Sequence, residues 1–121
     1  MVSRLVLIRH AKAENIRAGL ADEERKLTKA GKRSIKARFP LTLHLLSDLY
    51  EDDLHVWSSP ALRATQTADV VAKALNTPVE IHESLYESST ETFLSALADV
   101  NGTIIVIGHN PFIEDIYELI A

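Results

Sequence analysis

The stretch LVLIRHAKAE, residues 5–14, decides the fold, because a buried-strand pattern runs directly into two cationic side chains. Four apolar residues in a row, Leu5–Ile8, are typical of a strand that is covered on both faces of a sheet. Such a strand normally ends in a turn residue, whereas this one ends at Arg9 and His10. The meaning of this pair depends on whether other polar residues of the chain converge on it.

Three further short apolar runs have the same character as the first and predict three more buried strands: Leu54–Trp57, Val79–Ile81 and Ile104–Ile107. Helical patterns separate the four runs along the chain. Strands that alternate with helices predict an α/β fold with a mostly parallel sheet and helices on both of its faces. We find no internal repeat and no linker, so residues 1–121 are expected to form one domain.

The predicted helices are placed by their capping residues. Thr28 is expected to cap a helix over Lys29–Arg38 that Pro40 breaks or kinks, with a further helical stretch over 41–49. Three more helices are predicted. One has Ser59-Pro60 as its N-cap and first residue and ends at Asn76, and one runs from about Ser89 through Asp99. The last starts at Asn110-Pro111 and has an apolar face that includes Phe112, Ile113, Ile116, Tyr117 and Ile120.

Composition excludes several classes of protein. The chain has 121 residues, 46% of them hydrophobic, and no cysteine, so a disulfide framework and cysteine-bound zinc are excluded. The longest N-terminal apolar run, Leu5–Ile8, is too short for a signal sequence or a membrane span, which makes a cytoplasmic location the expectation. A net charge of −4 and only seven aromatic residues argue against nucleic-acid binding. No histidines stand at metal-ligand spacing, so no metal or other cofactor is expected.

Polar side chains follow three of the four predicted strands. Arg9-His10 follows the first, the segment SSPALRATQTA (58–68) places Arg63 near the start of a helix after the second, and GHN (108–110) follows the fourth. Because the carboxyl ends of parallel strands lie at one edge of a sheet, these groups are expected to meet there.

Two arginines, two histidines and two helix N-termini at one place suit a phosphoryl group. Guanidinium groups bind its oxygens in a bidentate manner, and helix N-termini offer free N–H groups. A neutral imidazole can attack phosphorus, and neighbouring arginines keep its pKa low. A second, protonated histidine would stabilise the charge of the transferring group.

The segments LIRHA (7–11), SSPALRATQTA (58–68) and VIGHNP (106–111), in this order, resemble the histidine phosphatase superfamily. Ala11 and the segment ERKLTKAGKRS (24–34) are most similar to its small SixA-type phosphohistidine phosphatases. The resemblance implies a phosphoglycerate mutase-like three-layer sandwich. It also implies that His10 is the phosphorylated nucleophile, and that Arg9, Arg63 and His109 surround the phosphate. Taken singly, each of these residues could equally be a capping, surface or core residue.

The leaving group also needs a proton, and members of the superfamily often take it from a carboxylate after the third strand. Glu83 and Glu87 lie in that region, and Glu87 is the better candidate for the general acid, although a solvated loop acid is an open alternative. An imidazole leaving group depends less on such an acid. A site with a weak acid therefore favours phosphohistidine on a protein as the substrate.

Other features keep two readings. Lys12 and Glu14 could line the pocket rim or lie in an exposed loop, and the basic stretch from Arg25 to Arg38 could dock an acidic phosphoprotein or simply be solvated. Relatives of this kind continue past the position of Ala121, so the domain looks short at its C-terminus; this would uncover a sheet edge, and the oligomeric state stays open. The alternatives to a phosphohistidine phosphatase are a small-molecule phosphomonoesterase and a non-catalytic phosphate-binding module.

Overall fold

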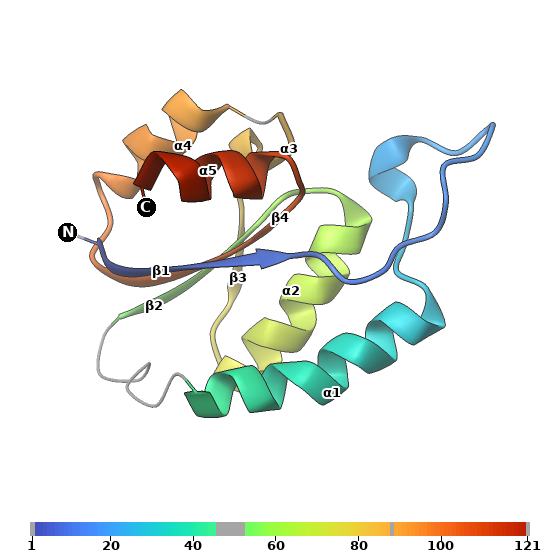
Figure 1. Ribbon diagram of the computed structural model, residues 1–121, viewed down its shortest axis with the longest axis horizontal. Coiled ribbons are helices and arrows are strands. Elements are labelled where there is room, and N and C mark those ends of the chain that lie inside the picture. The colour runs from blue at the N-terminus through green and yellow to red at the C-terminus, as the bar shows by residue number, and fades with distance from the viewer. Residues whose placement is uncertain (1, 46–52, 88, 121) are drawn as a thin grey trace.

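Four parallel strands form one sheet in the order β1-β4-β2-β3 in the computed structural model of the chain (Figure 1). The structure describes residues 2–45, 53–87 and 89–120. The strands are β1 (Val2–Arg9), β2 (Leu54–Ser58), β3 (Val79–Ile81) and β4 (Gly102–Gly108). Each of them contains one of the predicted apolar runs. The fold class predicted from the sequence is therefore confirmed.

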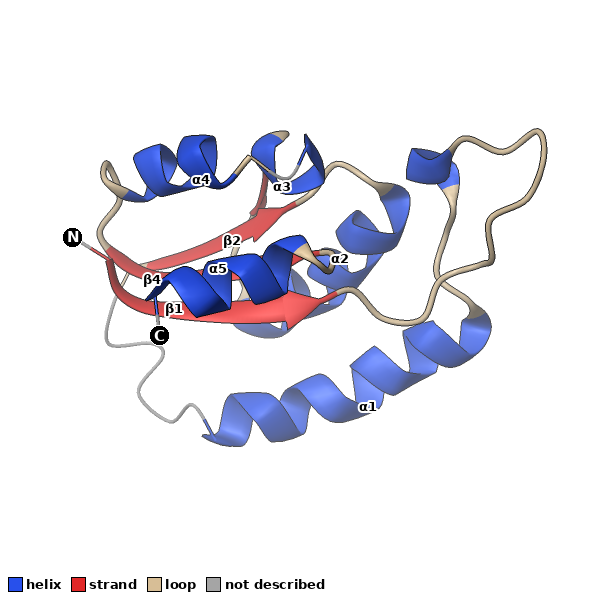
Figure 2. Cartoon of the chain, turned by 45° about the horizontal axis from the view of Figure 1, so that its top comes forward, coloured by secondary structure: helices blue, strands red, loops and turns tan. Residues whose placement is uncertain are grey.

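Helices cover both faces of the sheet, so that the molecule has three layers (Figures 1 and 2). On one face lie α1 (Lys29–Leu45) and α2 (Leu62–Leu75). On the other face lie α3 (Ser84–Glu87), α4 (Thr90–Leu97) and α5 (Phe112–Ile120). A long loop with a short 3-10 helix, η1 (Asp22–Glu24), joins β1 to α1 and projects beyond the carboxyl edge of the sheet.

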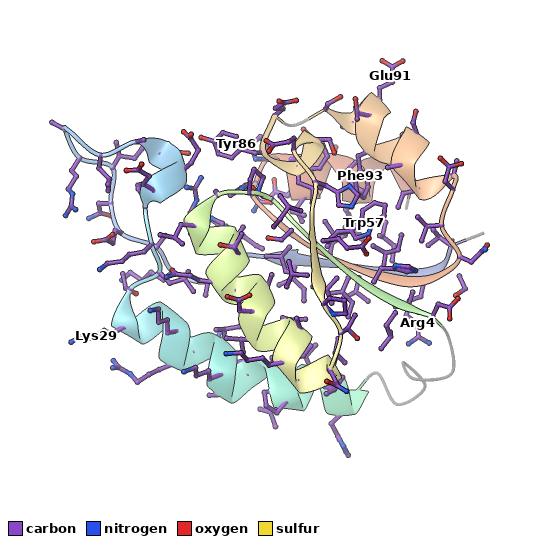
Figure 3. All side chains as sticks on the ribbon, turned by 180° about the vertical axis from the view of Figure 1, so that it is seen from behind. Arg4, Lys29, Trp57, Tyr86, Glu91 and Phe93 are labelled. Atoms are coloured by element: carbon purple, nitrogen blue, oxygen red, sulfur yellow. The ribbon has the colours of Figure 1, made fainter. Side chains whose placement is uncertain are left out.

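Alternate residues of β1, β2 and β4 enter two separate hydrophobic cores. In β3 only Val79 packs against a core, while Glu80 and Ile81 are exposed, so the prediction that this third run is buried is wrong. Ile105 and Ile107 of β4 pack with α1 and α2, whereas Ile104 and Val106 pack with α4 and α5. A strand that is buried on both faces needs apolar side chains at every position, which explains the uninterrupted runs in the sequence. Trp57 of β2 is 2% exposed and packs edge-to-face with Phe93 of α4, so the predicted core position of Trp57 is confirmed (Figure 3).

Several helix boundaries agree with the predictions. The Ser89 side chain accepts from the Thr92 N–H and caps α4, and Asn76 ends α2 in the left-handed conformation with φ 51°. The hydroxyl of Thr28 accepts from the Gly31 N–H at 2.9 Å at the start of α1.

Of the two outcomes predicted at Pro40, a break or a kink, the break is excluded, because α1 continues through this residue to Leu45, and the predicted helical stretch after Pro40 is confirmed as far as Leu45. Phe39 is buried and Leu43 packs against the same core, so apolar anchors on both sides of Pro40 hold the helix together. The predicted helical stretch over 46–49 lies outside the described residues.

The predicted start of α2 is also wrong. The helix begins at Leu62 with Ala61 as its N-cap, not at Pro60 with Ser59 as its cap. The Ser59 hydroxyl accepts from the Ala61 N–H at 3.2 Å and is turned toward His109 instead of toward the first turn of the helix.

In the part of the chain that the structure describes, no helix combines the length and the apolar character needed to cross a membrane. Strand β1 stands at the edge of the described sheet, with β4 as its neighbour.

Candidate active site

The polar residues that follow β1, β2 and β4 meet at one edge of the sheet. The order of strands makes β4 the central neighbour, with Arg9 paired to Gly108 and Ser58 paired to Ile107. Main-chain hydrogen bonds extend both pairings beyond the strands, from His10 N to the Gly108 carbonyl at 3.0 Å and from Ser59 N to the Ile107 carbonyl at 3.1 Å. The convergence that the sequence predicts is therefore present.

His10 and His109 lie side by side at this edge, with ring centroids 5.1 Å apart and ring planes 60° apart. Beside them opens a cleft of about 600 Å³, which is lined by Arg9, His10 and Arg63 together with Lys12, Arg25, Asn110 and smaller residues. Arg9 is exposed at the end of β1, whereas the Arg63 side chain is only 6% exposed. The four predicted phosphate-site residues thus form one cluster.

The His10 ring is held in one tautomer. Its Nδ1 lies 2.7 Å from the main-chain carbonyl oxygen of Ala11. A carbonyl oxygen can only accept a hydrogen bond, so Nδ1 carries the hydrogen and Nε2 keeps its lone pair. Ala11 is fixed in turn, because its N–H donates to Thr67 Oγ1 of α2 at 3.1 Å. Partial burial, together with the charges of Arg63 and Arg9, lowers the pKa of His10 below its usual 6.5, against the raising effect of the Ala11 bond.

His109 is oriented by Ser59 of the neighbouring strand end, with 2.7 Å between Nε2 and the Ser59 hydroxyl. The Tyr86 ring of α3 packs edge-on against it, with centroids 5.9 Å apart. Burial and the nearby Arg63 lower the pKa of His109 from 6.5 to about 4. This lowered pKa favours neutral His109 at pH 7 in the free protein, so the charge stabilisation expected of a protonated second histidine would need a bound anion that raises its pKa.

Arg63 is held by a residue that the sequence analysis did not single out. Its Nη1 donates to the Asp22 main-chain carbonyl at 2.7 Å, and its Nη2 donates to Asp22 Oδ2 at 3.0 Å. Asp22 belongs to η1, so the long loop after β1 folds back over the first turn of α2 (Figure 1).

Asp22 also contacts two further residues of the site, Arg25 and Tyr86. Its Oδ1 accepts from Arg25 Nε at 3.0 Å, and its Oδ2 accepts from the Tyr86 hydroxyl at 2.8 Å, so that Tyr86 extends from α3 toward η1 (Figure 3). These hydrogen bonds and the charge of Arg63 outweigh desolvation and lower the pKa of Asp22 to about 2, while burial and Asp22 raise the pKa of Tyr86 to about 12. Asp22 is ionised and Tyr86 is protonated at any physiological pH.

Two polar atoms of this cluster are buried without a partner among the described residues, namely Arg63 Nε and His109 Nδ1. Buried polar atoms are nearly always paired, so these two nitrogens are candidate contacts for a ligand in the cleft. The cleft residues carry three arginines and one lysine, which fits a multiply charged oxyanion.

The remaining predicted residues lie at various distances from the cluster. Glu87 ends α3 with an exposed side chain and follows Tyr86, and Lys12 is exposed on the cleft wall. Glu14 supports the loop instead, since its carbonyl accepts from Arg25 Nη1 at 2.7 Å. His82 stacks on Trp57 at 3.9 Å and His55 pairs with Glu80 at 3.3 Å, so both have the structural roles expected of them.

A cluster of two histidines and two arginines at the carboxyl edge of a parallel sheet is typical of α/β proteins that bind anionic ligands such as phosphoryl groups. Residues 5–97 match the histidine phosphatase superfamily (branch 1), and the chain belongs to this superfamily of phosphatases. No curated protein matches the chain significantly.

Solved structures give the same picture. The chain is similar to the candidate phosphohistidine phosphatase SixA from Agrobacterium tumefaciens, with a TM-score of 0.82, 31% identity, and coverage of 98% of this chain and 77% of that one. A SixA candidate from Nakamurella multipartitia matches with a TM-score of 0.69 and 32% identity, and the match covers 92% of this chain and 61% of that one. The protein histidine phosphatase SixA complexed with tungstate matches with a TM-score of 0.64 and 25% identity, and the match covers 93% of this chain and 73% of that one. The chain thus shares the SixA fold and spans less than the full length of each of these proteins.

Proposed function

We propose that the protein is a metal-independent phosphatase that transfers a phosphoryl group to His10 and then to water, with phosphohistidine on a protein as its substrate. The observation that carries the proposal is the hydrogen bond from His10 Nδ1 to the Ala11 carbonyl. It leaves the Nε2 lone pair as the nucleophile and fixes its direction. The lowered pKa of His10 keeps this nitrogen unprotonated at neutral pH.

In the first step, His10 Nε2 forms a bond to phosphorus while the bond from phosphorus to the substrate nitrogen breaks. The electron pair of that bond leaves with the substrate imidazole, which takes up a proton. In the second step a water oxygen attacks phosphorus, the bond to His10 Nε2 breaks, and inorganic phosphate leaves; the proton that this water loses to solvent balances the one that the substrate imidazole takes from solvent. His10 is restored in its starting form, so each turnover consumes one water.

The positive charge that the reaction needs comes from side chains. Arg9 and Arg63 line the cleft beside His10, and Arg63 Nε has no hydrogen-bond partner among the described residues. His109 has an unpaired Nδ1 beside them, and a bound dianion would raise its pKa. A relative is described as complexed with tungstate, which is a tetrahedral oxyanion like phosphate.

Two observations support phosphohistidine over phosphate esters. The structural neighbours are described as phosphohistidine phosphatases or candidates for that activity. Among the described residues that line the cleft there is no carboxylate, and an imidazole leaves with less help from an acid than an alkoxide does. The cytoplasmic location expected from the sequence stays a prediction.

The test is to incubate the protein with a phosphohistidine peptide and with an aryl phosphate. Released phosphate and acid-labile phosphate on the protein are measured for wild type, His10→Ala and the control His44→Ala, which removes an exposed histidine of α1. We expect release and labelling in wild type and in the control, and neither in His10→Ala. Unchanged release in His10→Ala would exclude the covalent mechanism, and no release from either substrate would exclude a phosphatase.

A further inference from the structure

A second groove adjoins the catalytic cleft on the side of α1. It has a volume of about 440 Å³ and runs between the segment 9–12 and one face of α1, formed by Gly31, Ser34 and Arg38 with their neighbours. Arg9, His10 and Lys12 line both the cleft and the groove. A molecule whose phosphoryl group lies at His10 therefore has direct access to the groove.

The groove is strongly cationic. Its ionisable lining residues are Arg9, Lys12, Arg38 and His10, with no acidic side chain among the described residues that form it. Helix α1 carries five Lys or Arg residues and no Asp or Glu. None of the side chains of Arg9, Lys12 and Arg38 is paired with a carboxylate within the described parts of the chain. Their charge is available to a partner.

This cationic surface is a local feature, because the chain as a whole has a net charge of −4. All Lys and Arg residues lie at or before position 73. The later residues, which include α3, α4 and α5, contain Asp and Glu but no Lys or Arg. Since α1 and these helices cover opposite faces of the sheet, the sequence asymmetry becomes a spatial one (Figure 2). An acidic partner is drawn to the α1 side and repelled from the other.

We infer that the groove between residues 9–12 and α1 binds an acidic segment that flanks the phosphohistidine of the protein substrate. The inference rests on the proposed function and adds to it the chemistry of the substrate around the phosphorylated residue. Gly31 and Arg38 are seven residues apart on α1, which corresponds to about 10 Å along the helix. An extended peptide covers this length in about three residues, so the Asp or Glu side chains belong within about three positions of the phosphohistidine.

The matched pair of variants is Arg38→Glu and Lys36→Glu. Both reverse one charge of α1, but only Arg38 lines the groove, and Lys36 is exposed about 200° further round the helix. Neither residue belongs to the catalytic cluster. Two fluorescent peptides carry the same non-hydrolysable phosphohistidine analogue, one flanked by three Asp or Glu residues on each side and the other by Ser and Gly.

We expect wild type to bind the acidic peptide at least tenfold more tightly than the neutral one at low salt, measured by fluorescence anisotropy. Arg38→Glu should reduce this ratio to less than about threefold, whereas Lys36→Glu should retain it. Equal binding of the two peptides to wild type, or equal losses in both variants, would overturn the inference. Tighter Arg38-dependent binding of a DNA oligonucleotide than of the acidic peptide would overturn the assignment to a protein partner.

Because binding is measured without turnover, the two proposals fail separately. If no phosphohistidine peptide releases phosphate but the acidic peptide still binds more tightly, the proposed phosphatase function is contradicted and the peptide-binding role of the groove is supported. If acidic and neutral peptides are hydrolysed with equal kcat/KM and bind with equal affinity, the phosphatase function is supported and the peptide-binding role of the groove is contradicted.

Discussion

Both terminal nitrogens of Arg63 donate hydrogen bonds to Asp22, a residue 41 positions earlier in the chain, whereas Arg63 Nε has no partner among the described residues. A guanidinium group has five N–H donors in one rigid plane. Asp22 occupies the Nη1–Nη2 end of that plane, so the plane is fixed while the edge that contains Nε is left for a ligand. We therefore regard Asp22 as a positioning residue for the phosphate site.

The variant Asp22→Asn tests this role. It keeps the shape and the main-chain carbonyl but removes the charge that holds Arg63 and Arg25. A hydrogen bond to a charged group contributes about 1.5–3 kcal/mol, so we expect kcat/KM to fall about 10- to 100-fold for phosphohistidine peptides and aryl phosphates alike.

The matched control is Glu23→Gln. Glu23 also accepts from the Tyr86 hydroxyl, at 3.3 Å, but the hydrogen bonds and the ion pair described for Arg63 go to Asp22 and not to Glu23. Its kinetics should stay within twofold of wild type. Asp22→Asn kinetics as fast as those of Glu23→Gln would show that Asp22 only stabilises the loop.

Both site histidines should titrate below pH 6.5 in the free protein. Burial and the arginine charges lower the pKa of His10, and lower that of His109 to about 4. NMR titration of the imidazole signals, assigned with His10→Ala and His109→Ala, measures both values. Added sulfate, which places a dianion beside the rings, should move both midpoints upward. Midpoints at or above 6.5 without an anion would contradict the described electrostatics.

Stability should decline as the pH falls from about 6.5 to about 4. In this window the unfolded chain binds a proton at residue 109, whereas the folded protein, with its pKa of about 4, does not. Stability thus rises with pH up to about 6.5 and levels off above it. We expect this histidine to account for about 1–2 kcal/mol of the unfolding free energy, because solvent reaches part of the ring and weakens the effect.

Urea unfolding at pH 4.5 and pH 7 measures this difference. The variant His109→Asn lacks the titrating group and should lose less stability between the two pH values. An equal loss in the variant and in wild type would assign the acid sensitivity to other groups.

Gly31→Ala should destabilise the protein, although alanine has a higher helix propensity than glycine by about 1 kcal/mol. A Cβ at this buried position would collide with the main-chain carbonyl of Lys12, which accepts from the Thr28 N–H at 2.9 Å. The start of α1 and the segment after His10 would have to separate, at a cost of about 1–3 kcal/mol. The melting temperature measured by thermal unfolding and kcat/KM should both decrease. A higher melting temperature would show that the two segments are not in close contact.

The parts of the site that could be predicted from the sequence are those where a strand and the polar residue after it are contiguous. Arg9-His10 and Gly108-His109 are of this kind, and the parallel sheet brings them together. Asp22 and Tyr86 could not be found in this way, since they are 64 residues apart and meet only through the fold of a loop over α3. Ser59 was predicted as a helix cap because its preference for capping is local, but the contact with His109 determines its role.

Glu87 as the general acid stays a prediction that one pair of variants can decide. An alkoxide is a poor leaving group, and general acid catalysis accelerates its departure roughly 10²–10⁴-fold. If Glu87 is the general acid, Glu87→Gln should slow hydrolysis of an alkyl phosphate at least 100-fold and that of a phosphohistidine peptide less than threefold, whereas a solvated Glu87 predicts no change in either rate. Glu83→Gln, which changes the other exposed acid of this region, should leave both rates near those of wild type. Initial rates on both substrates provide the comparison. An alkyl phosphate rate in Glu87→Gln equal to that of wild type would exclude Glu87, and a loss confined to Glu83→Gln would assign the acid to Glu83.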